Sequence, residues 1–297
     1  AGSVGRKVIH ALPKAYRVDG HNGISNPTGM HASGLEVTSH VVTAGASFVK
    51  DLESAVTSAG VSVKGMVLEP LASSEAILTQ KEKERGAAIV DIGGGTTDIV
   101  SFKKGAIDYT SVIPVGGFQF TNDICLTYNT SYYDAEQIKL KYANTEPASI
   151  DMREEFTLPV INSKSLTTVY RRDLCQLMRE RTLELIRLID LKLQQAGVRQ
   201  DASAQIVMTG GASTMPGFFD MAQQFIPNCS IRMGSPDHLS GMSEELETPA
   251  YSTGVGILLY GFRQEISSEK IARSQVRGTR NSGDVGLLNR IKRIFNF

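Results

Sequence analysis

One short segment of the sequence combines a carboxylate, a run of glycines and two hydroxyls. An apolar run over residues 87–90 leads into it. The residues that could bind an anion or its metal are Asp91, Gly93, Gly94, Gly95, Thr96 and Thr97. Glycine has no Cβ, so the backbone N–H groups of such a turn can approach an anion closely and converge on it. An aspartate at the end of the strand could hold Mg²⁺ through water, and Mg²⁺ usually accompanies a bound polyphosphate. The segment therefore predicts a phosphate-binding turn.

The residues after the glycines define the kind of turn. A second apolar run, which includes Ile99 and Val100, follows directly. A strand after the turn excludes the P-loop and the GxGxxG dinucleotide turn, because both lead into a helix. The alternative is a tight hairpin that binds nothing, but three glycines weaken strand ends unless a close approach requires them.

The hydrophobic pattern elsewhere predicts a mixed α/β chain. Period-two or continuous apolar runs predict strands over residues 7–10, 15–18, 35–43, 66–68, 106–113 and 206–208. Helical spacing predicts helices over residues 48–59, 71–83, 174–193, 218–225 and 251–262, and another after Gly117. Glycines stand where several of these elements end, at Gly60, Gly86 and Gly197.

Composition limits the function classes. The chain has 297 residues, enough for two to four lobes, and 31 basic and 31 acidic residues give a net charge of zero. A zero balance gives no support for nucleic-acid binding. Three widely spaced cysteines predict reduced thiols, as in a cytoplasmic protein. Neither a signal peptide nor an 18-residue apolar run is present, so we expect no membrane-spanning segment.

The C-terminal residues carry a different signal. From Arg263 onward, eight basic residues stand against three acidic ones, so this tail is +5 and the remainder of the chain is −5. Residues 263–284 are polar and predict a flexible linker. Residues 285–297 place apolar side chains on one helical stripe flanked by basic ones: Leu287, Leu288, Ile291, Ile294 and Phe295, with Arg290, Lys292 and Arg293. This pattern predicts an amphipathic helix in the interface of an anionic membrane, and the alternative is a terminal helix docked on the protein itself.

The glycine turn resembles the second phosphate loop of the actin, Hsp70 and sugar-kinase superfamily, and its neighbours resemble the FtsA family more closely. These neighbours are Leu68 to Ala76, Ile113 to Gly117, Asn26 to Met30 and Leu35 to Val37. The resemblance extends over roughly residues 6–262 and returns at the C-terminus. It implies an α/β fold of the actin/Hsp70-like ATPase type, with ATP and Mg²⁺ as cofactors and at most weak ATPase activity.

The resemblance also implies a role in cell division. Proteins of this family anchor FtsZ filaments to the cytoplasmic face of the bacterial membrane and help to assemble the septal ring. The implied partners are the C-terminal peptide of FtsZ, further copies of the protein in filaments, other divisome proteins and the anionic membrane surface. We expect the FtsZ peptide to bind to the lobe of residues 121–203. The charged edges of this lobe include Arg171, Arg172, Arg179 and Arg181.

Further site residues follow from the resemblance. Glu69 would face the γ-phosphate and position or deprotonate the attacking water. The alternative is that its carboxylate only stabilises the start of a helix by interacting with the helix dipole. Glu136 and Lys139 share one helix face and would clamp the ribose and purine, although spacing alone favours a surface ion pair. Gly210 and Gly211 would let backbone approach the flat base, and Met215 would cover one face of it. The alternative there is an ordinary strand-to-helix turn.

The implied organisation has several parts. Residues 1–64 form the inserted FtsA-type subdomain (an SHS2 domain), and 65–85 are a remnant of the first lobe. Residues 86–120 and 204–262 form the nucleotide-binding core of the second lobe, and 121–203 form its outer subdomain. The linker over 263–284 and the membrane-targeting helix over 285–297 complete the chain.

One feature departs from the superfamily. Its members have a second Asp-Gly phosphate loop near the N-terminus, and residues 1–86 contain none, so we expect the first lobe to be incomplete here. Two other functions stay open on the sequence alone: a pilus-assembly actin-like scaffold and a small-metabolite kinase of the same superfamily.

Overall fold

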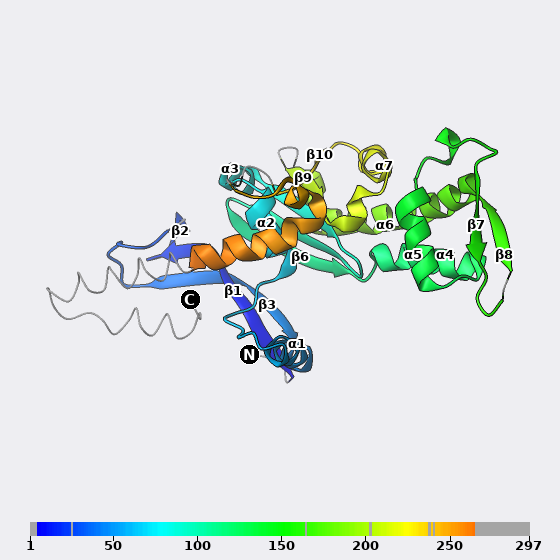
Figure 1. Cartoon of the computed structure of the whole chain (residues 1–297). Coiled ribbons are helices and arrows are strands. Elements are labelled where there is room, and N and C mark those ends of the chain that lie inside the picture. The colour runs from blue at the N-terminus through cyan, green and yellow to red at the C-terminus, as the bar shows by residue number, and fades with distance from the viewer. Residues whose placement is uncertain are drawn as a thin grey trace. The chain divides into compact units, whose positions relative to one another are not determined.

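The computed structural model describes residues 5–24, 26–163, 165–201, 204–236, 239 and 241–264 (Figure 1). The chain divides into two compact units. The smaller one contains Ala1–Leu68 and the chain from Gly254 onward, and the larger one contains Glu69–Thr253.

The smaller unit contains an antiparallel sheet and one helix before the first unit boundary. Its strands are β1 (Arg6–Val18), β2 (His21–Ile24) and β3 (Leu35–Gly45), in the order β2-β1-β3, and α1 (Ala46–Ser58) follows. The strands predicted over 7–10 and 15–18 are one continuous strand, whose register against β3 shifts between Val8 and His10 and between Pro13 and Ala15. The helix predicted before Gly60 is confirmed.

The larger unit is built around a five-stranded mixed sheet in the order β10-β9-β4-β5-β6. Its strands are β4 (Ala87–Ile92), β5 (Thr97–Lys103), β6 (Ala106–Ile113), β9 (Gln205–Thr209) and β10 (Ser230–Met233). Strands β4, β9 and β10 run parallel, whereas β5 is antiparallel to both β4 and β6. The glycine turn therefore joins two antiparallel strands, as predicted. It lies at the carboxyl ends of β4 and β9, the edge at which ligands bind in open α/β sheets.

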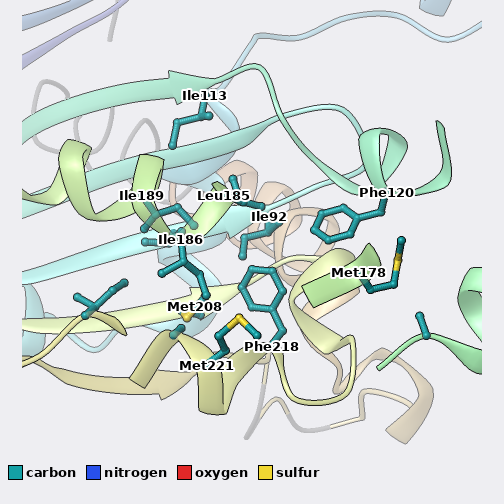
Figure 2. Close-up of a cluster of buried hydrophobic side chains, with 14 of the residues drawn as sticks. Ile92, Ile113, Phe120, Met178, Leu185, Ile186, Ile189, Met208, Phe218 and Met221 are labelled. Atoms are coloured by element: carbon teal, nitrogen blue, oxygen red, sulfur yellow. The ribbon is translucent and has the colours of Figure 1, made fainter. Parts of the chain in front are cut away.

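Helices cover both faces of this sheet. Helices α2 (Glu69–Ile77) and α3 (Gln80–Arg85) pack against β4 and β5. On the other face lie α6 (Arg171–Gln195) and α7 (Phe218–Phe225), whose apolar side chains meet those of β4 and β9 (Figure 2). Ile92, Ile186, Met208 and Phe218 are at most 1% exposed. Full burial of one such side chain contributes about 1.5–3 kcal/mol, so this layer fixes the sheet that carries the turn.

The remaining elements of the larger unit form a lobe around the N-terminal half of α6 (Figure 1). They are α4 (Gly117–Tyr128), α5 (Tyr132–Tyr142), β7 (Glu155–Pro159) and β8 (Leu166–Tyr170). Short 3-10 turns occur at Pro147–Ser149, Val198–Gln200, Gly211–Thr214 (η3), Glu244–Leu246 (η4) and Pro249–Tyr251, and residues 252–264 are helical.

Two local predictions are wrong. Residues 66–68 are not a strand, because among the described residues no strand pairs with them. The single helix predicted over 71–83 is two helices, α2 and α3. The Thr79 side chain accepts a hydrogen bond from Glu82 N and the Glu82 carboxylate accepts one from Thr79 N, so a capping box starts a new helix at this point.

The predicted membrane-targeting helix over 285–297 lies outside the described residues, as does the linker beyond residue 264. Within the described part of the chain, no helix is both long enough and apolar enough to span a membrane.

Candidate functional site

The glycine turn is closed by its own backbone and open on its outer side. Gly93 N donates to the Thr96 carbonyl at 2.9 Å. Gly94 and Gly95 are exposed, have no left-handed φ, and have no heavy atom within 4 Å of the position that a Cβ would take. The protein's own packing therefore does not require glycine at either position, whereas a ligand lying on the turn would.

The N-terminus of α4 supports the turn from behind. Gly117 N and Phe118 N donate to the carbonyls of Gly93 and Gly94 at 2.9 and 2.6 Å. A Cβ on Gly116 would lie 2.7 Å from the Gly93 carbonyl oxygen, so this approach requires glycine. The Gly116–Gly117 pair thus holds two carbonyls of the turn, and these carbonyls cannot point at an anion.

The two threonines after the glycines have different environments. The hydroxyl of Thr96, which is partly exposed, donates to Asp98 Oδ2 at 2.8 Å. Thr97 is fully buried and its hydroxyl donates to the Val115 carbonyl at 2.8 Å. Both hydroxyls therefore donate within the protein in this structure, and Thr96 is the threonine at the surface of the turn.

Three carboxylates lie around the turn. Asp91 and Asp98 are register partners across the hairpin, and they are 2% and 6% exposed. Burial raises the pKa of Asp91, and hydrogen bonds from Ser73 and Thr253 oppose the rise. Burial, together with the charge of Asp91, also raises the pKa of Asp98, while the hydrogen bond from Thr96 lowers it.

Glu69, the third carboxylate, begins α2 at the boundary between the two units. The residue is exposed overall, but its Oε1 lies 3.8 Å from the position that a Cβ on Gly93 would take. Desolvation of the carboxylate, and then the charges of Asp91 and Asp98, raise its pKa to about 7. A carboxylate with a pKa near neutrality can accept and release a proton at physiological pH, as a general base must.

Glu136 and Lys139 share one face of α5, as their spacing predicts, and Lys139 Nζ lies 2.8 Å from Glu136 Oε2. Lys139 also donates to Thr121 Oγ1 at 2.8 Å and to the Gly117 carbonyl at 3.2 Å, and the Thr121 hydroxyl donates to Glu136 Oε2. All three N–H donors of Lys139 are thus used within the protein. The pair joins α5 to the first turn of α4, beside the glycine turn.

The segment after β9 packs against the end of β4. Gly210 has a φ of +89°, and a Cβ there would lie 2.4 Å from the Ile92 carbonyl oxygen and 2.5 Å from Asp91 Oδ1. Gly210 is thus required by packing against Asp91 and Ile92. A Cβ on Gly211 would make only an ordinary contact, 3.7 Å from Ala250 Cβ, so this glycine is not required by packing. Met215 is partly buried against the hydrophobic core.

The predicted site residues from four segments therefore all belong to the larger unit. Gly117 N donates to the Gly93 carbonyl of the glycine turn, and the Gly117 carbonyl accepts a hydrogen bond from Lys139 of α5. A Cβ on Gly117 would lie 3.6 Å from Ala212 Cβ of η3, and a Cβ on Gly93 would lie 3.8 Å from Glu69 Oε1. Sequence reasoning missed Ser73, Thr253 and Thr121, whose hydroxyls bind Asp91 and Glu136. Single hydroxyl residues without a spacing pattern give no sequence signal for such a role.

A separate groove of about 350 Å³ lies between α4 and α6. It is lined by Asp123, Leu126, Thr127, Leu177, Glu180, Arg181 and Glu184. Arg181 makes a bidentate ion pair with Asp123, at 2.6 and 2.8 Å, and contacts Glu184 at 2.5 Å. Leu126, which lines this groove, is 74% exposed. An exposed apolar side chain in a groove makes the groove a candidate protein-binding surface.

Solved structures with similar folds define the class of protein. A PilM–PilN type IV pilus biogenesis complex matches over 83% of this chain and 65% of the other, with a TM-score of 0.58 and 18% identity. MreB5 of Spiroplasma citri bound to ADP matches over 74% of this chain and 67% of the other, with a TM-score of 0.55 and 16% identity. The chain has an actin-like ATPase fold.

Sequence comparison gives the family. The family model for the cell division protein FtsA matches residues 88–256, and the model for the SHS2 domain inserted in FtsA matches residues 2–43. The chain is 35% identical to FtsA of Pseudomonas aeruginosa over 288 residues, which cover 97% of this chain and 69% of the relative. FtsA of Escherichia coli K12 is 32% identical over 277 residues, which cover 91% of this chain and 66% of that relative. The chain belongs to the FtsA family of cell division proteins and spans about two thirds of the length of these relatives.

Proposed function

We propose that the larger unit binds ATP with its phosphates on the outer side of the glycine turn. The observation that carries this proposal is the openness of Gly94 and Gly95. Both are glycines without left-handed φ and without neighbours that would exclude a side chain. A bound anion that approaches the backbone accounts for glycine at these positions, because a side chain would occupy the space of the phosphate.

The surrounding residues fit the other parts of a nucleotide. Glu136 and Lys139 flank the turn on the side of α5 and would bind the ribose and purine. Gly211 is exposed and a Cβ there would meet only Ala250 Cβ, at 3.7 Å, so a flat base could approach its backbone, and Met215 would cover one face of the base. Because the three donors of Lys139 are already used, we expect nucleotide binding to replace at least one of its present hydrogen bonds.

The carboxylates suit Mg²⁺ held through water. In the described part of the chain, no group of three or more His, Cys, Asp or Glu side chains is arranged to hold a metal. Mg²⁺ keeps several waters and takes phosphate oxygens as ligands, so one or two carboxylates such as Asp91 suffice. When bound, the ion would neutralise phosphate charge. Glu69 would then position a water near the γ-phosphate and take its proton, in at most slow hydrolysis.

The direct test is binding of a fluorescent ATP analogue, with competition by unlabelled ATP and by AMP. We expect ATP to compete better than AMP, since AMP lacks the phosphates that reach the turn. Displacement by AMP as effective as that by ATP would contradict the turn as a phosphate site.

We further propose that the protein is a scaffold that anchors FtsZ filaments to the cytoplasmic face of the membrane at the division septum. Membership of the FtsA family supports this function over the pilus-assembly scaffold and the metabolite kinase. The basic, amphipathic sequence of residues 285–297 suits an anionic membrane surface. Self-association into filaments and contacts with other divisome proteins belong to the same proposal.

The lobe of residues 121–203 is our proposed site for the C-terminal peptide of FtsZ. Its groove offers exposed Leu126 beside Leu177 for the apolar part of such a peptide. Of the four arginines expected to contact it, Arg171 binds Glu154, Arg179 binds the Thr145 carbonyl and Arg181 binds Asp123. Arg172 is exposed, so a charge contact is best tested at this residue.

A further inference from the structure

The carboxylate of Asp91 is held from one side by two hydroxyls on different helices. Ser73 Oγ, from α2, donates to Asp91 Oδ2 at 2.6 Å. Thr253 Oγ1, from the helix over residues 252–264 (orange in Figure 1), donates to the same oxygen at 3.2 Å. The two hydroxyl oxygens are 2.9 Å apart, so the three groups form one closed network within the larger unit.

The network leaves little freedom in the placement of its protons. Ser73 Oγ also lies 3.2 Å from the Glu69 carbonyl, but its single proton goes to the closer and charged acceptor, Asp91. Thr253 then donates either to Asp91 or to Ser73 Oγ. Ser73 is fully buried and Asp91 is 2% exposed, so water does not readily replace the Ser73 hydroxyl, whereas Thr253 is only half-buried.

The other carboxylate oxygen is in a different situation. Among the described residues, no hydrogen-bond donor is assigned to Asp91 Oδ1, and this oxygen faces the Cα side of Gly210. Any side chain at Gly210 would lie 2.5 Å from Oδ1 and cover it. Oδ2 of Asp91 is therefore anchored by two hydroxyls, whereas Oδ1 accepts no hydrogen bond from the described residues.

We propose that Ser73 and Thr253 are positioning residues, which hold Asp91 by Oδ2 so that Oδ1 faces the water shell of a nucleotide-bound Mg²⁺. The inference rests on the proposed nucleotide site. Partners that orient a metal-binding carboxylate in this way commonly change metal affinity about 10- to 100-fold when they are removed. Their loss acts on the metal and leaves the phosphate turn itself intact.

The test compares Thr253→Val, which keeps the shape and removes the hydroxyl, with Thr253→Ser, which keeps the hydroxyl. Ser73→Ala is the second loss variant. Its matched control is Ser74→Ala, because Ser74 is equally buried on α2 but donates only to the Leu71 carbonyl, at 2.7 Å. Binding of a fluorescent ATP analogue is measured in EDTA and across a Mg²⁺ titration, and thermal unfolding is measured without nucleotide.

We expect the half-saturating Mg²⁺ concentration to rise about tenfold or more in Thr253→Val and Ser73→Ala, with unchanged affinity in EDTA. Thr253→Ser and Ser74→Ala should match wild type in both conditions. Equal losses in EDTA and in Mg²⁺ would assign the hydroxyls a purely structural role and overturn the inference. So would loss variants whose Mg²⁺ titration matches that of wild type. If wild type binds the analogue equally well with and without Mg²⁺, this inference is wrong but the nucleotide site stands. If wild type does not bind the analogue at all, the nucleotide site is wrong and this inference with it.

Discussion

Gly116 and Gly93 lie in direct backbone contact, and a Cβ on Gly116 would be 2.7 Å from the Gly93 carbonyl oxygen. The same Cβ would lie 2.8 Å from Thr96 N and 2.9 Å from the carbonyl carbon of Gly94. All three are backbone atoms of the turn, and they cannot move aside as a flexible side chain can. The shape of the turn therefore depends on a loop that follows it only after two further strands, β5 and β6.

Gly116→Ala is accordingly expected to distort the turn and to destabilise the protein by about 1–3 kcal/mol, the usual cost of overpacking. Urea unfolding followed by circular dichroism measures this change. Gly94→Ala is the matched control, since its new Cβ meets no atom within 4 Å. Equal stability of the two variants would show that the loop can move away from the turn.

Gly94→Val is expected to abolish binding of an ATP analogue while leaving the protein folded, because the branched side chain occupies the space over the turn. The measurement is fluorescence anisotropy, with circular dichroism as the check on folding. Gly65→Val, at another open glycine, serves as the control for the added side chain. Unchanged affinity in a folded Gly94→Val protein would reject the phosphate role of the turn.

Glu69 gives the site a pH dependence whose direction follows from its pKa. The folded protein holds the pKa at about 7, above the ordinary 4.5, so the folded state binds the proton more tightly than the unfolded state. Stability from this group therefore falls as pH rises from about 4.5 to 7 and stays low above it. Glu69→Gln should raise the melting temperature at pH 8, with little difference from wild type at pH 4. Glu245→Gln, at an exposed glutamate of η4, is the control.

The same residue predicts how any hydrolysis of ATP responds to pH. A base with a pKa of about 7 is half ionised at pH 7 and about one tenth ionised at pH 6, so the rate should fall about fivefold between them. Phosphate release under saturating ATP measures this dependence. A rate that is flat between pH 6 and 8, or unaffected by Glu69→Gln, would remove Glu69 from the chemistry.

Local features of this fold were predictable from the sequence, because they depend on residues close together in the chain. The hairpin follows from two apolar runs around three glycines, and the Glu136–Lys139 pair follows from their spacing on one helix turn. The division of 71–83 into two helices was also readable, since Thr79 and Glu82 have the capping-box spacing. The strand expected over 66–68 failed because three apolar residues specify no pairing partner.

Contacts between distant segments were not predictable in this way. Gly210 packs against Asp91, and Thr253 binds the same carboxylate from 162 residues further along the chain. Whether Thr97 faces a ligand or the Val115 carbonyl also depends on how a separate loop packs. Such positions are set by the parallel pairing of β4 with β9 and by the helices around the sheet, which no local pattern encodes.

Leu126→Asp is expected to weaken binding of an FtsZ C-terminal peptide about tenfold or more, since burying a leucine contributes about 1.5–3 kcal/mol. Fluorescence anisotropy with the labelled peptide measures the affinity. Leu140→Asp is a close control, because Leu140 is 72% exposed, compared with 74% for Leu126, and lies in the same lobe outside the groove. Arg172→Glu in parallel tests the charge contact. Equal affinities for the Leu126 and Leu140 variants would exclude the groove as the peptide site.

The C-terminal stripe makes the last prediction, which rests on sequence alone. Five large apolar side chains would each contribute very roughly 1–2 kcal/mol on partial insertion. Three basic residues would add about 1 kcal/mol each on anionic lipid, less the cost of ordering the helix. We therefore expect reversible, salt-sensitive binding to anionic liposomes.

Replacing Ile291 and Phe295 by Glu should abolish co-sedimentation. Replacing Asn289 and Asn296 by Glu adds the same charge off the stripe and should weaken binding far less. If the stripe variant still sediments like wild type, residues 285–297 are not the anchor.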